Sequence, residues 1–287
     1  MKRPVLDLVH ARFSCRTYLP KPLEDQVQAR LRDHLAGLTA GPFGGRIRIV
    51  LVAASAEDER ALKGLGTYGT IRNPQGFLVG VLGPGSRNLE DLGYAMEGAI
   101  LAATDLGLGT CWLGGFFQRS RFVAKAGLAA DETVPAVASI GYCADAAKTG
   151  GLFGLLSGRS SRLAPEKIFF SESFNGPLSP EEAGLFTDAL ECVRWAPSAS
   201  NKQPWRIVRQ GGRWHFFLRR TRGYQGGLQR RLMGQADLQR IDVGIAMCHF
   251  ELAAREAGLT GTWETADPGL QRPDDLTSYA ATWYPRS

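Results

Sequence analysis

The sequence has no apolar run long enough to cross a membrane. Its longest stretch of this kind, Gly76 to Gly83, falls far short of the roughly 20 residues that a spanning helix needs. Near the N-terminus, Asp7 and His10 interrupt the apolar residues before the core of a signal peptide can form, and no small-residue cleavage site follows. We therefore expect a soluble, cytoplasmic protein without a membrane partner.

Cysteine and histidine are scarce as well. The five cysteines are widely spaced and contain no C-x-x-C pair, so neither a disulfide framework nor a zinc ribbon is indicated. We expect reduced, partly buried thiols. The four histidines show no metal-ligand spacing, and no metal site is predicted. His249 falls in an apolar helical stretch, where a core residue is the favoured interpretation.

Lysine is rare, with seven residues against 27 arginines in a chain of net charge +6. Arginine suits phosphate better than lysine does, because its planar fork offers paired donors. Eight arginines fall between Arg206 and Arg231, interleaved with aromatic residues, and this pattern fits a nucleic-acid or phosphate patch. Because no nucleic-acid-binding motif accompanies it, the favoured interpretation is the solvated face of a hairpin and lid, and no nucleic-acid partner is expected.

What the sequence does contain is a repeat. Its 287 residues, 44% of them hydrophobic, suffice for one large domain or two small ones. Residues 91–112 read DLGYAMEGAILAATDLGLGTCW, and 151 residues later residues 242–263 read DVGIAMCHFELAAREAGLTGTW, with ten identities and no gap. Each copy is typical of a long buried helix that ends at a glycine and is followed by a short strand.

The similarity extends upstream, more weakly. Both copies have a Pro-Leu pair followed by a helical stretch and a strand, the helices at 24–38 and 180–195 and the strands at 47–53 and 206–208. The unit of helix, helix, strand, strand, buried helix and strand is used twice, which predicts an α+β fold. We expect residues 1–163 and 164–287 to be two tandem copies that pack as an internal dimer.

The copies differ first in a short polar segment. In the first copy, Arg12, Ser14 and Arg16 alternate along the chain, so an extended backbone would point all three side chains to one side. Two guanidinium groups and a hydroxyl suit a phosphate monoester, although an arginine-rich surface turn is the alternative. The corresponding residues of the second copy, none of them a cation, are Phe169, Ser171 and Ser173.

The second difference is the loop between helical stretch and strand. Residues 196–205 read APSASNKQPW, whereas residues 41–46 of the first copy read GPFGGR. Ordinary turn chemistry explains the longer loop. A rigid hydrogen-bonding loop over a flat heterocycle explains it equally, because short polar side chains lie between two prolines.

These segments resemble the flavin-dependent nitroreductases. That family carries an Arg-x-Ser-x-Arg near the N-terminus, an A-P-S-x-x-N-x-Q-P-W loop, and a buried helix that runs into G-L-G-x-C-W-x-G-G, which match residues 12–16, 196–205 and 107–115. Its ordinary members are homodimers, and each site joins the arginine segment of one subunit to the loop of the other. The chain is similar to a fused, duplicated branch in which two halves replace two subunits. The resemblance implies a nitroreductase-like α+β fold, a monomer that suffices, and one complete site.

The resemblance also implies one FMN per chain. It places Arg12 and Ser14 at the phosphate and ribityl end, and Arg16 at the phosphate or the pyrimidine edge. Phe13 stands where the family usually has a second basic residue, and Arg72 falls where pyrimidine contacts are found, without a motif to fix it. The other implied contacts are Arg162 to the phosphate, Gly114 and Gly115 to flavin N5 through a backbone N–H, and Pro197, Ser198 and Asn201 over the ring.

The implied activity is passage of a hydride from NADH or NADPH, through flavin N5, to a nitroaromatic, a quinone or a similar small acceptor. No side chain is then required as a catalytic group. Phe116, Phe117 and Tyr224 are candidates for stacking on the acceptor. Because Phe13 and Ser160 replace basic residues of the family, the alternative is a non-catalytic flavin-binding or partner-binding scaffold. Residues 64–69 fit G-x-G-x-x-G, but a charged helical run precedes them, so no Rossmann site is predicted.

Overall fold

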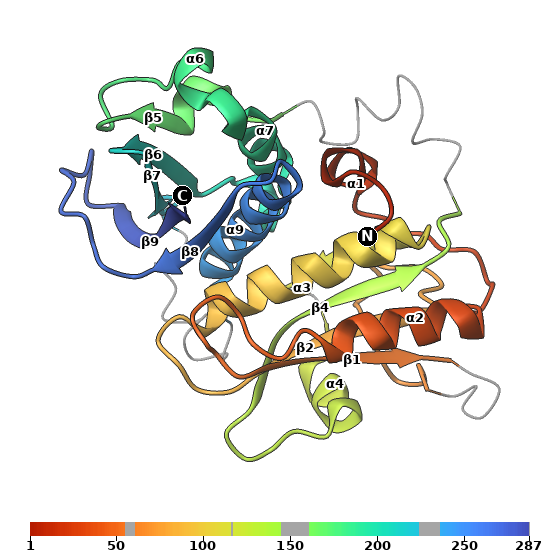
Figure 1. Ribbon diagram of the computed structural model, residues 1–287. Coiled ribbons are helices and arrows are strands. Elements are labelled where there is room, and N and C mark those ends of the chain that lie inside the picture. The colour runs from red at the N-terminus through yellow and green to blue at the C-terminus, as the bar shows by residue number, and fades with distance from the viewer. Residues whose placement is uncertain (55–60, 116, 145–160, 224–235, 287) are drawn as a thin grey trace.

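The computed structural model describes residues 1–54, 61–115, 117–144, 161–223 and 236–286 (Figure 1). The N-terminal half comprises α1 (Val5–Ala11), α2 (Asp25–Ala36), β1 (Ile47–Ala53), β2 (Gly76–Leu82), α3 (Asn88–Asp105), β3 (Gly109–Leu113), α4 (Arg119–Ala126) and β4 (Thr133–Gly141). The C-terminal half comprises β5 (Phe169–Ser171), α6 (Pro180–Ala183), α7 (Thr187–Trp195), β6 (Trp205–Gln210), β7 (Arg213–Arg219), α9 (Leu238–Glu256), β8 (Thr260–Glu264) and β9 (Thr277–Arg286).

The described residues of each half form one sheet, and the two sheets share a strand order. The first runs β1-β2-β4-β3 and is antiparallel throughout. The second contains the antiparallel order β6-β7-β9-β8, to which β5 adds in parallel beside β6. In both halves a helix precedes the first strand of this order, and a long helix joins the second strand to the third along the chain. The α+β prediction is confirmed.

The long helices α3 and α9 pack against each other between the two sheets (Figure 1). Their crossing is close because glycines lie at the contact. A Cβ added at Gly93 would collide with the carbonyl oxygen of Ile241, and one added at Gly244 would collide with the carbonyl oxygen of Glu90. These contacts correspond to each other in the repeat, so the crossing is reciprocal, as in an interface between two copies of one surface.

Strand β2 is buried on both faces, which explains its continuous apolar sequence. Leu78 and Leu82 face the core that contains α3. Phe77, on the opposite face, meets Phe122 of α4 edge to face, with ring centroids 4.9 Å apart. Helix α4 therefore covers the side of the first sheet that α3 leaves open (Figure 1).

Most predicted elements form within a few residues of their expected bounds. One exception is the helix predicted over 180–195, which consists of α6 and α7 separated by a 3₁₀ turn, Gly184–Phe186. Gly184 adopts φ 52°, which the α-helix does not permit. Another exception is the first helix of the second copy, where the described residues before β5 form only a 3₁₀ turn, Pro165–Lys167. Among the helices that the structure describes, none is both long enough and apolar enough to cross a bilayer.

Candidate functional site

Two adjoining cavities lie between the halves. The smaller has a volume of about 160 Å³ and the larger about 320 Å³, and the larger falls within the range of about 300 to 1,000 Å³ that is typical of ligand pockets. Residues of both halves line both cavities: Ser14, Arg16, Pro197, Ser198 and Ser200. The arginine segment (residues 12–16) and the polar loop (residues 196–205) thus meet at one site.

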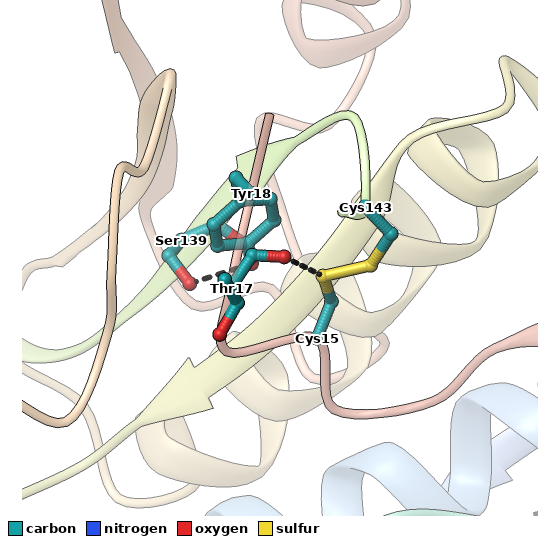
Figure 2. The surroundings of a disulfide bond; sticks show 5 residues. All are labelled: Cys15, Thr17, Tyr18, Ser139 and Cys143. Atoms are coloured by element: carbon teal, nitrogen blue, oxygen red, sulfur yellow. Dashed lines mark hydrogen bonds between the residues drawn. A yellow bond between two sulfur atoms is a disulfide. The ribbon is translucent and has the colours of Figure 1, made fainter. Parts of the chain in front are cut away.

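Backbone contacts hold the arginine segment in the predicted extended form. The Cys15 N–H donates to the Thr110 carbonyl at 2.9 Å, and the Arg72 N–H donates to the Arg16 carbonyl at 2.8 Å. Beyond the segment, the buried Tyr18 hydroxyl lies 2.8 Å from the Ser139 hydroxyl (Figure 2). Residues 12–16 are therefore fixed between β3 and the backbone at Arg72 rather than forming a surface turn.

A disulfide joins Cys15 to Cys143 beside these contacts (Figure 2). The prediction of reduced thiols is wrong for this pair, whereas Cys111, Cys192 and Cys248 are free and buried. The two cysteines are 128 residues apart in the sequence, so their pairing could not be predicted from the spacing of the cysteines. The two cysteines meet because the chain after Cys15 forms a bridge from Tyr18 to Cys143 at the end of β4.

Arg12 is buried at the wall of the larger cavity, in a charged cluster with Glu97 and His249. Glu97 accepts from Trp112 Nε1 at 2.7 Å and from His249 Nε2 at 2.9 Å, and its Oε1 lies 3.8 Å from Arg12 Nε. His249 Nδ1 lies 2.8 Å from the Cys192 carbonyl oxygen, which can only accept, so both ring nitrogens have a hydrogen-bond partner. The expectation that His249 is a hydrogen-bonded core residue is confirmed.

The charges of this cluster favour an anion in the larger cavity. Burial acts to raise the pKa of Glu97, but the hydrogen bond and charge of His249, together with the charge of Arg12, hold that pKa below its ordinary value. The cluster therefore contains an ionised carboxylate that faces the Arg12 guanidinium. The guanidinium groups of Arg16 and Arg162 line the same cavity, so its wall carries a clear excess of positive charge.

The polar loop is held rigidly by its own hydrogen bonds. The Ser198 hydroxyl accepts from the Gln203 N–H at 2.9 Å. Arg162 donates to the Ala196 carbonyl at 2.7 Å and to Asn201 Oδ1 at 3.2 Å. Ser200, Asn201 and Gln203 all have positive φ, between 47° and 53°, a strained conformation that persists only where surrounding contacts impose it. Such strain is often found at ligand sites.

Helix α9 and strand β3 supply the apolar wall of the smaller cavity. The wall residues there are Leu238, Ile241 and Ile245 of α9, Cys111 and Trp112 of β3, and Ala136 of β4, with Gly114, Ala199 and Asp242 beside them. Burial raises the pKa of the Cys111 thiol, despite the opposing charges of Arg16 and Arg12. The thiol is therefore neutral, and this cavity is suited to a flat, largely apolar guest.

Nine of the eleven residues predicted to bind a cofactor line these cavities: Arg12, Phe13, Ser14, Arg16, Gly114, Arg162, Pro197, Ser198 and Asn201. Arg72 and Gly115 are not among the lining residues that the structure describes. The backbone of Arg72 supports Arg16, but its side chain is exposed. Gly115 is exposed at the end of β3.

Of the predicted stacking residues, Phe117 is buried against Phe122, with ring centroids 5.4 Å apart, and belongs to the core beneath α4. Phe116 and Tyr224 lie outside the described residues, as does Ser160. Sequence reasoning missed Trp195, Ile241, Ile245 and Asp242, which line the cavities. The repeat contained a signal for Asp242, because this residue is identical to Asp91 of the first copy.

The equivalent loop of the N-terminal half, residues 41–46, is occupied by a side chain of α3 from the same half. Asp91 accepts from the N–H groups of Phe43 and Gly45 at 2.9 and 2.7 Å. Its side chain lies directly against Gly41 and Gly45, where an added Cβ would collide with it. In the repeat, Ser173 corresponds to Arg16. Its side chain is a neutral hydroxyl, which accepts from the Asn175 N–H at 3.3 Å.

Known proteins share this fold. A family model described as "Putative TM nitroreductase" matches residues 4–254. A nitroreductase structure from Thermotoga maritima matches with TM-score 0.58 at 17% identity, over 99% of this chain and 94% of that one. A nitroreductase in complex with FMN from Desulfovibrio desulfuricans matches with TM-score 0.40 at 22% identity, over 51% of this chain and 90% of that one. No curated protein matches in sequence. The family match spans most of the chain, so the chain belongs to this nitroreductase family.

Proposed function

We propose that the chain is an FMN-dependent oxidoreductase that takes reducing equivalents from NADH or NADPH and passes them to a small acceptor, such as a nitroaromatic or a quinone. The observation that carries the proposal is the joining, in adjoining cavities, of the cationic arginine segment to the strained polar loop. Relatives described as oxidoreductases or nitroreductases that contain FMN support the choice of cofactor.

The residues present fit FMN at both ends. Arg12, Arg16 and Arg162 line the larger cavity, and guanidinium groups bind a phosphate through paired, charge-assisted hydrogen bonds. The apolar wall of the smaller cavity fits a flat ring system, with Pro197 and Ser198 of the polar loop as its cover. At Gly114 an added Cβ would press against the end of the Leu238 side chain, so glycine leaves the most room for the ring there. When bound, FMN would supply the hydride chemistry that no side chain provides.

We further propose that residues 1–163 and 164–287 are tandem copies that form an intramolecular pseudo-dimer with one site. The shared strand order and the reciprocal Gly93 and Gly244 contacts support this arrangement. A single chain then contains both parts of the site, and a monomer suffices. The second potential site is lost because neither Ser173 nor the loop at Gly41 supplies the groups found at the first.

Flavin counting and anaerobic reduction test the proposal. The purified chain, supplied with FMN and gel-filtered, should hold one FMN, and anaerobic NADH or NADPH should bleach its yellow absorbance within seconds. Stoichiometric FMN that stays oxidised under both donors would identify the alternative, a flavin-binding scaffold without this activity. A chain that retains no FMN would overturn both interpretations.

A further inference from the structure

Asp91 and Asp242 are equivalent residues with different hydrogen bonding. Both oxygens of Asp91 accept backbone N–H groups, from Phe43 and from Gly45. In Asp242 only Oδ1 accepts, from the Ala199 N–H of the polar loop at 3.0 Å. Among the residues that the structure describes, Oδ2 of Asp242 is buried without a hydrogen-bond partner.

Asp242, which carries this unpaired Oδ2, lines the candidate site. Asp242 is 3% exposed and lines the smaller cavity, as do Ile241, Ser198 and Arg16. A buried polar atom without a partner costs free energy, so a ligand that pairs with it gains affinity. Oδ2 is therefore placed to contact whatever occupies this cavity.

The surroundings of Asp242 favour the neutral acid. Burial raises its pKa well above 3.8, the Ala199 N–H opposes that shift, and the nearby carboxylate of Asp237 adds to it. Arg240, two residues before Asp242 on α9, donates to Glu90 across the crossing, with Nε 2.8 Å from Oε1. A neutral carboxyl group carries one O–H donor, and with Oδ1 accepting from Ala199 that donor is on Oδ2.

We propose that Asp242 is a protonated cofactor-binding residue whose Oδ2–H donates a hydrogen bond to an acceptor atom of the bound flavin. The inference rests on the proposed function and adds to it a neutral donor at the seam of the two halves. It also explains why both oxygens of Asp91 accept hydrogen bonds from the neighbouring loop, whereas only one oxygen of Asp242 does.

Infrared difference spectroscopy, with FMN minus FMN-free protein, tests the proposal together with the variants Asp242→Asn and Asp91→Asn. The wild-type chain should show the C=O band of a protonated carboxyl at neutral pH, and FMN should shift it to lower frequency. ¹³C-aspartate labelling distinguishes this band from flavin carbonyl bands. The band should vanish in Asp242→Asn and persist in Asp91→Asn.

FMN affinity, measured by quenching of flavin fluorescence, supplies the second readout. Asp242→Asn keeps an acceptor for Ala199 and an N–H donor toward the cavity, so its Kd should stay within about threefold of wild type, since one kind of hydrogen bond replaces another. An ionised Asp242 that accepts from the flavin predicts instead a loss of about tenfold or more. Asp91→Asn should leave the Kd unchanged and lower the melting temperature.

The outcomes separate the possibilities. A band that FMN does not shift would show that Asp242 only anchors the loop, and absence of the protonated band would show an ionised carboxylate; either result overturns the inference and leaves the proposed function standing. A wild-type chain that binds no FMN overturns the proposed function and the inference together.

Discussion

The two halves of the molecule share a framework and differ in the segments that meet at the cavities. Strand order, the long helices and the glycines at their crossing recur in both halves. The arginine segment has no cationic counterpart near Ser173, and the polar loop has no counterpart at Gly41. Packing against a common core constrains the framework, whereas surface segments change without loss of the fold. The comparison therefore separates residues that hold the halves together from residues that form the site.

The largest expected effect is on the site. Changing Arg12 and Arg16 together to alanine should lower FMN affinity on the order of a hundredfold or more, because each guanidinium offers hydrogen bonds worth about 1.5 to 3 kcal/mol to a charged group. The purified variant should be colourless, and its circular dichroism should match wild type. Flavin fluorescence titration gives the affinity.

Arg46→Ala is the matched control for the arginine variant. Arg46 is exposed and pairs with Asp131 in the same half, and it lines neither cavity. Its loss should leave FMN binding unchanged. Stoichiometric FMN in the double variant would contradict the assignment of the arginine segment.

The framework is tested at the helix crossing. Gly93→Ala should lower the free energy of unfolding by about 3 kcal/mol, the upper end of the usual cost of overpacking, because the new Cβ meets the Ile241 carbonyl oxygen. Gly244→Ala should cost a similar amount if the crossing is reciprocal. Urea unfolding measures both.

The same helix provides the control. At Gly98, also in α3, an added Cβ would meet only Cys248 Sγ, at 3.9 Å. Gly98→Ala should therefore stabilise the chain by up to about 1 kcal/mol, since alanine is the better helix former. Equal effects of Gly93→Ala and Gly98→Ala would refute the close crossing.

A smaller effect is expected from the buried ion pair between the halves. Glu97→Gln should cost about 1 to 3 kcal/mol at neutral pH, because the amide leaves one of the donors that face Glu97 unpaired. The folded-state pKa of Glu97 lies below its ordinary 4.5. Its stabilisation is therefore present above pH 4.5 and is lost as the pH falls through the lower folded value.

Urea unfolding at a series of pH values checks this prediction. The difference between wild type and Glu97→Gln should shrink on acidification below pH 4.5. In the background of His249→Gln the same change should cost less, because the hydrogen bond and charge of His249, which help to hold the pKa of Glu97 low, are then already gone. A difference that is independent of pH would show that Glu97 is not ionised in the folded chain.

Periodicity and the repeat were sufficient to predict the framework, because buried helices and strands leave a strong pattern in one sequence. The meeting of the arginine segment with the polar loop followed from the family resemblance and is what the cavities show. The Cys15–Cys143 disulfide and the wall residues Ile245 and Asp242 were not predicted. Such contacts depend on how distant segments pack, and a sequence pattern records only which residues are near along the chain.

The smallest expected effect is a null result that sharpens the comparison between the halves. Ser173→Arg restores to the C-terminal half the cation that corresponds to Arg16, yet the chain should still hold one FMN. The opposing loop lacks polar side chains at Gly41 and Gly45, and Asp91 already takes the space beside them. Flavin counting by absorbance against protein concentration checks the ratio. Two FMN per chain would mean that a single cation had decided which half binds, and the role assigned to the polar loop would then be wrong.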